Sequence, residues 1–178
     1  MVNFLKEHYS LPWLTGRNRR RSNIVPANVH YRDATSILVL FTMLGNARVT
    51  RMRSLQKLLE MDGKSVTFIY ILLDAKDLPD AHMDEGMIRV RREDVSLYGK
   101  LINVKVKKLL EDKFDFLIHG DMESNPYADY LLSKSKAKSK VGRHMENREH
   151  LYDLMIEIGL EHKLGFLLEQ IYKYTKVV

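Results

Sequence analysis

The fold is decided by the stretch LIHGDMESNPYADYLL, residues 117–132. It runs from an apolar strand through an acidic turn into a helix. Asn125 is a favourable N-cap, and Pro126 stands at the first helical position, where its missing N–H costs nothing. A strand that leads directly into a helix is half of a βαβ unit, so this stretch predicts a parallel sheet if the same order repeats along the chain.

The same order does repeat. Continuous apolar runs such as SILVLF (36–41) predict strands that are buried on both faces of a parallel sheet, and apolar residues three and four apart predict the helices between them. The segment NVKVKK (103–108) is compatible with either a helix or a strand, because its apolar residues also alternate as in a strand. The predicted elements are strands at 36–41, 65–73, 87–90, 114–119, 138–143 and 152–158, and helices ending near 61 and 110 and spanning 126–135 and 161–175.

Together these elements predict a three-layer, Rossmann-like α/β sandwich with a mostly parallel sheet of about five or six strands. In 152–158 the strict alternation of YDLMIEI predicts a half-exposed strand near an edge, with Tyr152 on the same face as Ile156. Residues 36–178 form one domain in this interpretation. Residues 1–35 precede it as a short helix, broken by Pro12, and a basic arm.

Composition limits the classes of function. The 178 residues include no cysteine, which excludes disulfides, thiolate metal sites and cysteine nucleophiles. The N-terminus lacks the pattern of a secretory signal, and the longest apolar run, Ile37–Phe41, is too short to span a membrane. We therefore expect a cytoplasmic protein without a membrane partner. The net charge of +6 favours partners that carry phosphate or other anions.

Two turns could bind a ligand, because ligands of open α/β sheets bind beyond the carboxyl ends of the strands. The first turn carries Gly45 and Asn46, with Thr50 one turn into the following helix, and could receive an anion at the helix N-terminus. No glycine-rich dinucleotide or phosphate-loop fingerprint accompanies it, so a plain turn glycine is the favoured interpretation.

The second turn carries His119, Asp121 and Glu123, followed by Asn125. Alternate spacing on an extended backbone would place the first three side chains on one side, as a general base or a ligand contact requires. Helix capping also explains the acids and Asn125 without any ligand, and we favour it. We predict no cofactor, no metal site and no catalytic residue, because no catalytic signature is present.

Basic residues gather in two clusters that could contact phosphate. A solvated surface is favoured over nucleic-acid binding, because no aromatic residues interleave with the second cluster and no nucleic-acid motif is present. The first cluster consists of Arg17, Arg19, Arg20 and Arg21, and the second of Lys134, Lys136, Lys138, Lys140 and Arg143.

The segments KFDFLIHGD (113–121), SKAKSKVGR (135–143) and YDLMI (152–156) resemble a small bacterial Rossmann-like family of unknown function. More distantly, the chain resembles the N-terminal half of heptosyltransferase-type glycosyltransferases. Gly45, Asn46 and Thr50 fall where those enzymes have a Gly-Asp-x-x-x-Thr pattern. The resemblance implies the same Rossmann-like fold, but Asn46 replaces the acid that would act as catalytic base, and an amide cannot accept the proton. The C-terminal half, which in that family holds the sugar nucleotide, has no counterpart here.

The favoured hypothesis is therefore a non-catalytic Rossmann-like module that binds a protein partner or a small anionic ligand. A remnant glycosyltransferase, or another enzyme that binds a sugar nucleotide, is the first alternative. Nucleic-acid binding through the basic clusters is the second. Self-association stays compatible with each of these hypotheses.

Overall fold

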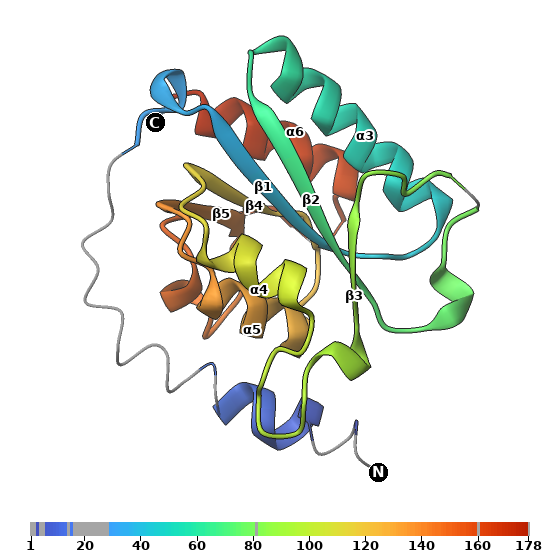
Figure 1. Ribbon diagram of the computed structural model, residues 1–178. Coiled ribbons are helices and arrows are strands. Elements are labelled where there is room, and N and C mark those ends of the chain that lie inside the picture. Colours follow the sequence, from blue (N-terminus) through green and yellow to red (C-terminus); the bar gives the residue numbers. More distant parts are fainter. Residues whose placement is uncertain are drawn as a thin grey trace.

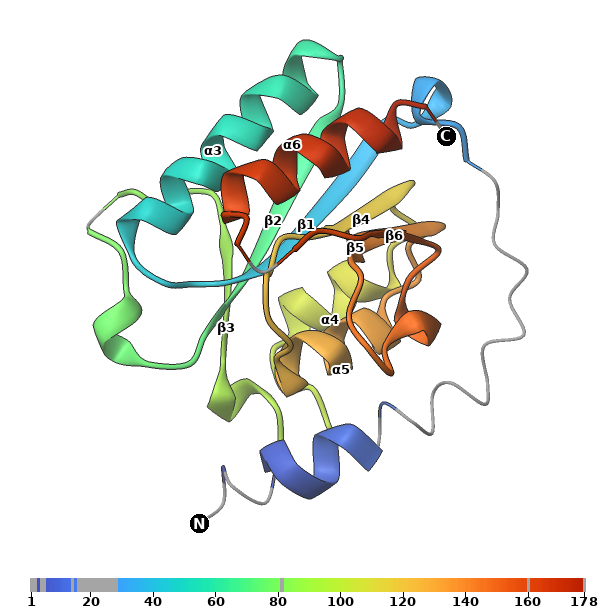
Figure 2. The same ribbon diagram turned by 180° about the vertical axis from the view of Figure 1, so that it is seen from behind.

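The sheet is parallel throughout and has six strands in the order β3-β2-β1-β4-β5-β6 (Figures 1 and 2). This computed structural model describes residues 3, 6–13, 15, 29–80, 82–159 and 161–177. The strands are β1 (Ser36–Thr42), β2 (Ser65–Leu72), β3 (Ile88–Arg91), β4 (Phe116–His119), β5 (Ser139–Arg143) and β6 (Leu154–Ile156).

Helices cover both faces of the sheet, which confirms the predicted three-layer α/β sandwich. Figures 1 and 2 show α3 and α6 over one face and α4 and α5 over the other. The α-helices are α3 (Asn46–Met61), α4 (Val104–Glu111), α5 (Pro126–Lys134) and α6 (Leu164–Thr175). The short helices are η1 (Lys6–Ser10), η2 (Tyr31–Asp33), η3 (Ala75–Asp77), η4 (Arg92–Asp94) and η5 (Glu149–Leu151). None of the helices in the described part of the chain is long and apolar enough to cross a membrane.

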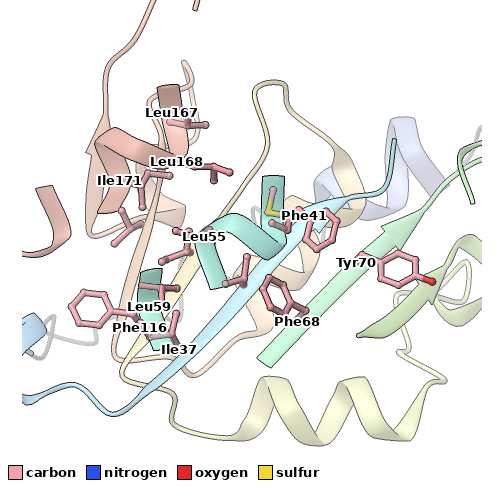
Figure 3. Packing of buried hydrophobic residues seen from close by; sticks show 14 of the residues in the cluster. Ile37, Phe41, Leu55, Leu59, Phe68, Tyr70, Phe116, Leu167, Leu168 and Ile171 are labelled. Carbon is pink, nitrogen blue, oxygen red and sulfur yellow. The ribbon is translucent and has the colours of Figure 1, made fainter. Parts of the chain in front are cut away.

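Alternation along the strands divides the core into two layers. Ile37 and Phe41 of β1 face α3 and α6, where they pack with residues such as Leu55 and Leu167 (Figure 3). The intervening residues of β1 and β4, such as Leu38 and Leu117, face α4 and α5 instead. Because both faces of these strands are buried, their sequences read as continuous apolar runs.

The segment that is ambiguous in the sequence, 103–108, is helical from Val104 onward. The side chain of Asn103 accepts a hydrogen bond from the backbone N–H of Val106 at 3.3 Å and caps α4. Val106 and Leu110 are buried against the sheet. The lysines between them are exposed, so the buried residues follow the spacing of a helix and not the two-residue alternation of a strand.

The last strand differs from the prediction. β6 begins only at Leu154, and Tyr152 packs in the α4–α5 layer, whereas Ile156 packs in the opposite layer. The two residues therefore do not share a face. The backbone N–H of Asp153 donates to the carbonyl of Lys140 in β5 at 2.8 Å. The regular alternation of side chains begins only after this residue.

Residues 6–13 pack on the domain near the loop after β3 (Figures 1 and 2). Helical residues continue through Pro12 to Trp13, so the predicted break at Pro12 is wrong. Leu11 is fully buried in the α4–α5 layer, and this packing outweighs the preference of proline for a helix end. Tyr31 is also buried in the core. The boundary at residue 35 stays a prediction that truncation can test.

Candidate functional site

The topological switch point lies between β1 and β4, and Asp121 closes it. Its carboxylate accepts hydrogen bonds from the backbone N–H of Thr42 at 2.9 and 3.1 Å and from the Thr42 hydroxyl at 2.6 Å. Asn125 donates to the same hydroxyl at 3.0 Å and accepts from the N–H of Tyr127 at 2.9 Å. Asn125 therefore caps α5 as the sequence predicts, whereas Asp121 bonds to the end of β1 rather than to the helix.

His119 joins this network from the last position of β4. Its Nε2 lies 3.2 Å from Asp121 Oδ2, and its Nδ1 lies 2.8 Å from the Tyr152 hydroxyl. Burial, with Asp129 and Asp121 nearby, raises the pKa of Tyr152, so its hydroxyl stays protonated. A carboxylate can only accept, so His119 Nε2 donates to Asp121, while Nδ1 pairs with the Tyr152 hydroxyl.

Electrostatics keep Asp121 ionised although it is buried. Burial acts to raise the pKa of Asp121, but the hydrogen bond from His119 and the charges of His119 and Arg48 outweigh it and lower the pKa. Arg48 Nη1 lies 3.6 Å from Asp121 Oδ1 and donates to the carbonyl of Gly120 at 2.9 Å. Burial in turn lowers the pKa of Arg48, against the opposing charges of Asp121 and Glu123.

We define the carboxyl-edge network as Thr42, Arg48, His119, Asp121, Asn125 and Tyr152. A general base must reach the proton it abstracts. His119 is completely buried and Asp121 is 3% exposed, and their polar atoms contact one another. Glu123 is exposed and does not join them. No group of three or more potential metal-ligating side chains occurs in the described ranges. The network therefore closes the switch point with paired groups.

The first predicted turn is also joined to its neighbours. Gly45 has a φ of 76°, which favours glycine, and its N–H donates to the carbonyl of Asp77 at 3.0 Å. The Asn46 side chain donates to the carboxylate of Asp80 at 2.6 Å and accepts from the Asp80 N–H at 2.9 Å. The Thr50 hydroxyl donates to the carbonyl of Asn46 at 3.1 Å. These contacts attach the turn to the loop between β2 and β3.

The second basic cluster divides into two parts. Lys138 forms an ion pair with Asp115 at 2.7 Å. Arg143 donates to the carbonyls of Met122 at 2.6 Å and Ile158 at 3.1 Å. Lys140 is half-buried, and burial lowers its pKa against the opposing charge of Asp153. Lys138 and Arg143 are therefore engaged by groups of the domain itself, and Lys140 is partly withdrawn from solvent. The first cluster, Arg17, Arg19, Arg20 and Arg21, lies outside the described residues.

The other two lysines of the cluster line an open pocket between α4 and α5. We call it the lysine pocket. It has a volume of about 370 Å³, an apolar floor and a basic rim. Its floor includes Leu101, Leu110 and Tyr130, and its rim carries Lys100, Lys107, Lys134, Lys136 and Glu111.

The rim lysines differ from those that the fold uses. The ion pairs of lysines within the described ranges join Lys76, Lys138 and Lys176 to aspartates. Lys100, Lys107 and Lys136 form none there. Lys134 lies over the ring of Tyr130, 5.6 Å from its centroid. The pocket therefore gathers four lysines, with Glu111 as the one acidic side chain among its lining residues.

The sequence analysis did not identify every residue of the carboxyl-edge network or of the lysine pocket. Alternation placed Tyr152 on a strand face, although Gly142 offered a signal: a Cβ there would lie 2.5 Å from the Tyr152 ring, so only glycine allows this approach. Lys100 and Lys107 carried no local signal. They are far from Lys134 and Lys136 in sequence and meet them only because α4 packs beside α5.

Over residues 10–178 the sequence matches a family of unknown function, DUF6913. The chain belongs to this family. No curated protein matches it. Among solved structures, the chain is similar to E. coli heptosyltransferase WaaC with ADP-2-deoxy-2-fluoro heptose, at a TM-score of 0.50 and 12% identity. The match covers 78% of this chain and 48% of that one, so the chain spans about half the length of WaaC. Both resemblances noted in the sequence are confirmed, and the second concerns the fold.

Proposed function

We propose that this member of DUF6913 is a non-catalytic, Rossmann-like module that binds a small anionic ligand in the lysine pocket. The observation that carries the proposal is the placement of four lysines around one apolar hollow. Lysine is a strongly hydrated point charge on a flexible stem, so the rim can adjust to anionic groups of different shape.

The chemistry of the pocket also limits the ligand. An exposed ion pair contributes only about 0–1 kcal/mol, so the rim alone supports weak binding. Contact with Leu101, Leu110 and Tyr130 would add roughly 25 cal/mol for each Å² of apolar surface removed from water. The ligand favoured by these contacts carries an anionic group together with an apolar or flat portion.

The non-catalytic part of the proposal is supported by the carboxyl-edge network. Asp121 and His119 are buried and bonded to each other. Asn46, at the position where the resembling enzymes carry an acid, is an amide that bonds to Asp80. An enzyme that binds a sugar nucleotide stays the alternative, and turnover that depends on Asp121 or His119 would favour it.

Thermal shift with a small ligand panel tests the proposal. We suggest pyrophosphate, citrate and ADP, the last because WaaC was solved with an ADP-sugar analogue. A ligand at about 100 times its Kd adds roughly 2.7 kcal/mol of stability. For a chain of this length that corresponds to a rise in Tm of roughly 5–10 °C. If contact with the apolar floor adds to the affinity, ADP should raise the Tm by more than pyrophosphate at the same concentration.

The matched variants are Lys107→Gln with Lys136→Gln, and Lys57→Gln with Lys163→Gln. Both pairs remove the same charge from exposed positions, and Lys57 and Lys163 belong to the opposite layer, on α3 and at the start of α6. The first pair should abolish the shift and the second should leave it. Equal losses in both pairs would indicate a non-specific charge effect and contradict the proposal.

A further inference from the structure

Three large apolar side chains are exposed within seven residues beside the lysine pocket. The exposed fractions are 88% for Tyr98, 57% for Ile102 and 76% for Val104. We call these residues the apolar strip. Single exposed apolar residues are ordinary on protein surfaces, but a cluster of them marks an interaction site.

The loop that carries the strip is held in place. Ser96 N–H donates to the carbonyl of Lys100 at 2.9 Å, and Gly99 N–H donates to that of Ser96 at 3.0 Å. The Tyr130 hydroxyl donates to the carbonyl of Gly99 at 2.5 Å, which attaches the loop to α5. A surface of this kind loses little conformational entropy when a partner binds.

The strip and the lysine pocket are continuous. Gly99, Lys100 and Leu101, which lie between Tyr98 and Ile102, all line the pocket. Val104 begins α4, and Lys107 follows three residues later on the same side of the helix. A partner that places an anionic group in the pocket therefore extends over the strip.

Charge limits the kind of partner. Between residues 98 and 108 the sequence carries four lysines (Lys100, Lys105, Lys107 and Lys108) and no acid. An acidic partner is complementary to this surface. A lipid surface shares the negative charge but is flat, whereas the pocket is a hollow of about 370 Å³ that receives a projecting group. A polypeptide supplies both projecting carboxylates and apolar side chains.

We propose that the apolar strip and the lysine pocket together dock an acidic, amphipathic segment of a partner protein. Its carboxylates lie against the rim lysines, and its apolar side chains cover Tyr98, Ile102 and Val104. The inference rests on the proposed function, because the same lysines hold the anion. It adds that the anion is presented by a polypeptide.

Two labelled peptides of equal length and charge test the inference by fluorescence anisotropy. One alternates glutamate with leucine, and the other alternates glutamate with serine. We expect the leucine peptide to bind at least about tenfold more tightly, which corresponds to about 1.4 kcal/mol. The Tyr98→Ser, Ile102→Ser, Val104→Ser variant should remove this difference and leave pyrophosphate binding unchanged.

The control is Leu58→Ser, Met61→Ser, Tyr174→Ser, which removes three exposed apolar residues from the opposite layer. It should keep the difference between the two peptides. Equal binding of the peptides, or a difference that survives in the strip variant, would overturn the inference and leave the proposed function standing.

Two further outcomes would assign this surface differently. Binding to phosphatidylserine vesicles that is lost in the strip variant, without binding of the leucine peptide, would overturn the inference in favour of a lipid surface. Pyrophosphate and glutamate–serine peptide affinities that Lys107→Gln with Lys136→Gln leaves unchanged would instead overturn the proposed function.

Discussion

The carboxyl-edge network and the lysine pocket are both clusters of polar side chains, yet their physical states are opposite. In the network, Asp121 and His119 are buried and each polar group has a partner of the complementary kind. In the pocket, lysines of like charge surround an open hollow. The place where this fold class conventionally binds ligands is therefore filled with structural contacts, and an excess of lysines over acids lines a hollow between two helices instead.

The largest expected effect is on the network. Asp121→Ala leaves the Thr42 N–H and hydroxyl and His119 Nε2 without their buried acceptor. Removing one member of a buried, charged pair costs roughly 3–5 kcal/mol. The Tm in thermal denaturation should fall by roughly 6–20 °C. Glu123→Ala, two residues away and exposed, should change stability by less than about 0.5 kcal/mol.

An unchanged Tm in Asp121→Ala, combined with loss of ligand binding, would reverse the comparison. The carboxyl edge would then be the ligand site, and the lysine pocket would be a solvated surface.

Acid sensitivity should also come from the structural aspartates. Burial acts to raise the pKa of Asp115, but hydrogen bonds from Lys138 and from the N–H groups of Thr35 and Ser36 outweigh it and lower the pKa, as the network does for Asp121. Below about pH 4 these aspartates bind protons in the unfolded state but stay ionised in the folded state, where their pKa values are lower. Stability is thus fully present at neutral pH and falls, by about 1.4 kcal/mol per pH unit for each such group, as the solution is acidified.

The contribution of Asp129 to stability changes with pH in the opposite direction. Burial raises its pKa, against the opposing charge of Arg148, so its contribution to stability increases as the pH falls. Urea unfolding between pH 7 and pH 3 should give a shallower acid slope for Asp121→Asn and a steeper one for Asp129→Asn. Equal slopes in both variants would contradict these pKa directions.

A smaller loss is expected for Tyr152→Phe. The ring still packs beside Gly142, but His119 Nδ1 loses its hydrogen bond of 2.8 Å. A buried polar group without a partner costs about 1–3 kcal/mol, measurable by urea denaturation. Because Tyr172 donates to Asp62 in a less buried place, Tyr172→Phe is the matched control and should cost less. The reverse order would show that the network stabilises the fold less than its burial implies.

The smallest effect on stability is expected in the lysine pocket. Lys107→Gln with Lys136→Gln should change the free energy of unfolding by no more than about 0.5 kcal/mol, because exposed charges contribute little. Relief of repulsion among the rim lysines opposes the loss of favourable contacts, so the sign of this change is not diagnostic. Loss of anion binding at unchanged stability would separate the pocket from the network most clearly. A loss of several kcal/mol would show that these lysines serve the fold.

Local pattern predicted much of this molecule. The strands around Ile37 and Ile118 are recognisable because burial on both faces requires continuous apolar runs. The cap at Asn125 is recognisable because a helix start needs an acceptor for its N–H groups. The start of β6 is not recognisable, since it depends on which strand accepts the Asp153 N–H.

The sequence by itself determined the α/β class, the succession of strands and helices along the chain, and the cap of α5. Each of these depends on residues only a few positions apart. Only the tertiary structure decided the partners of polar side chains. Asp121 meets Thr42 across 79 residues because β1 and β4 are neighbours in the sheet. Lys107 and Lys136 meet because α4 and α5 lie side by side. Charges and hydrogen bonds act through space, and chain order does not encode that proximity.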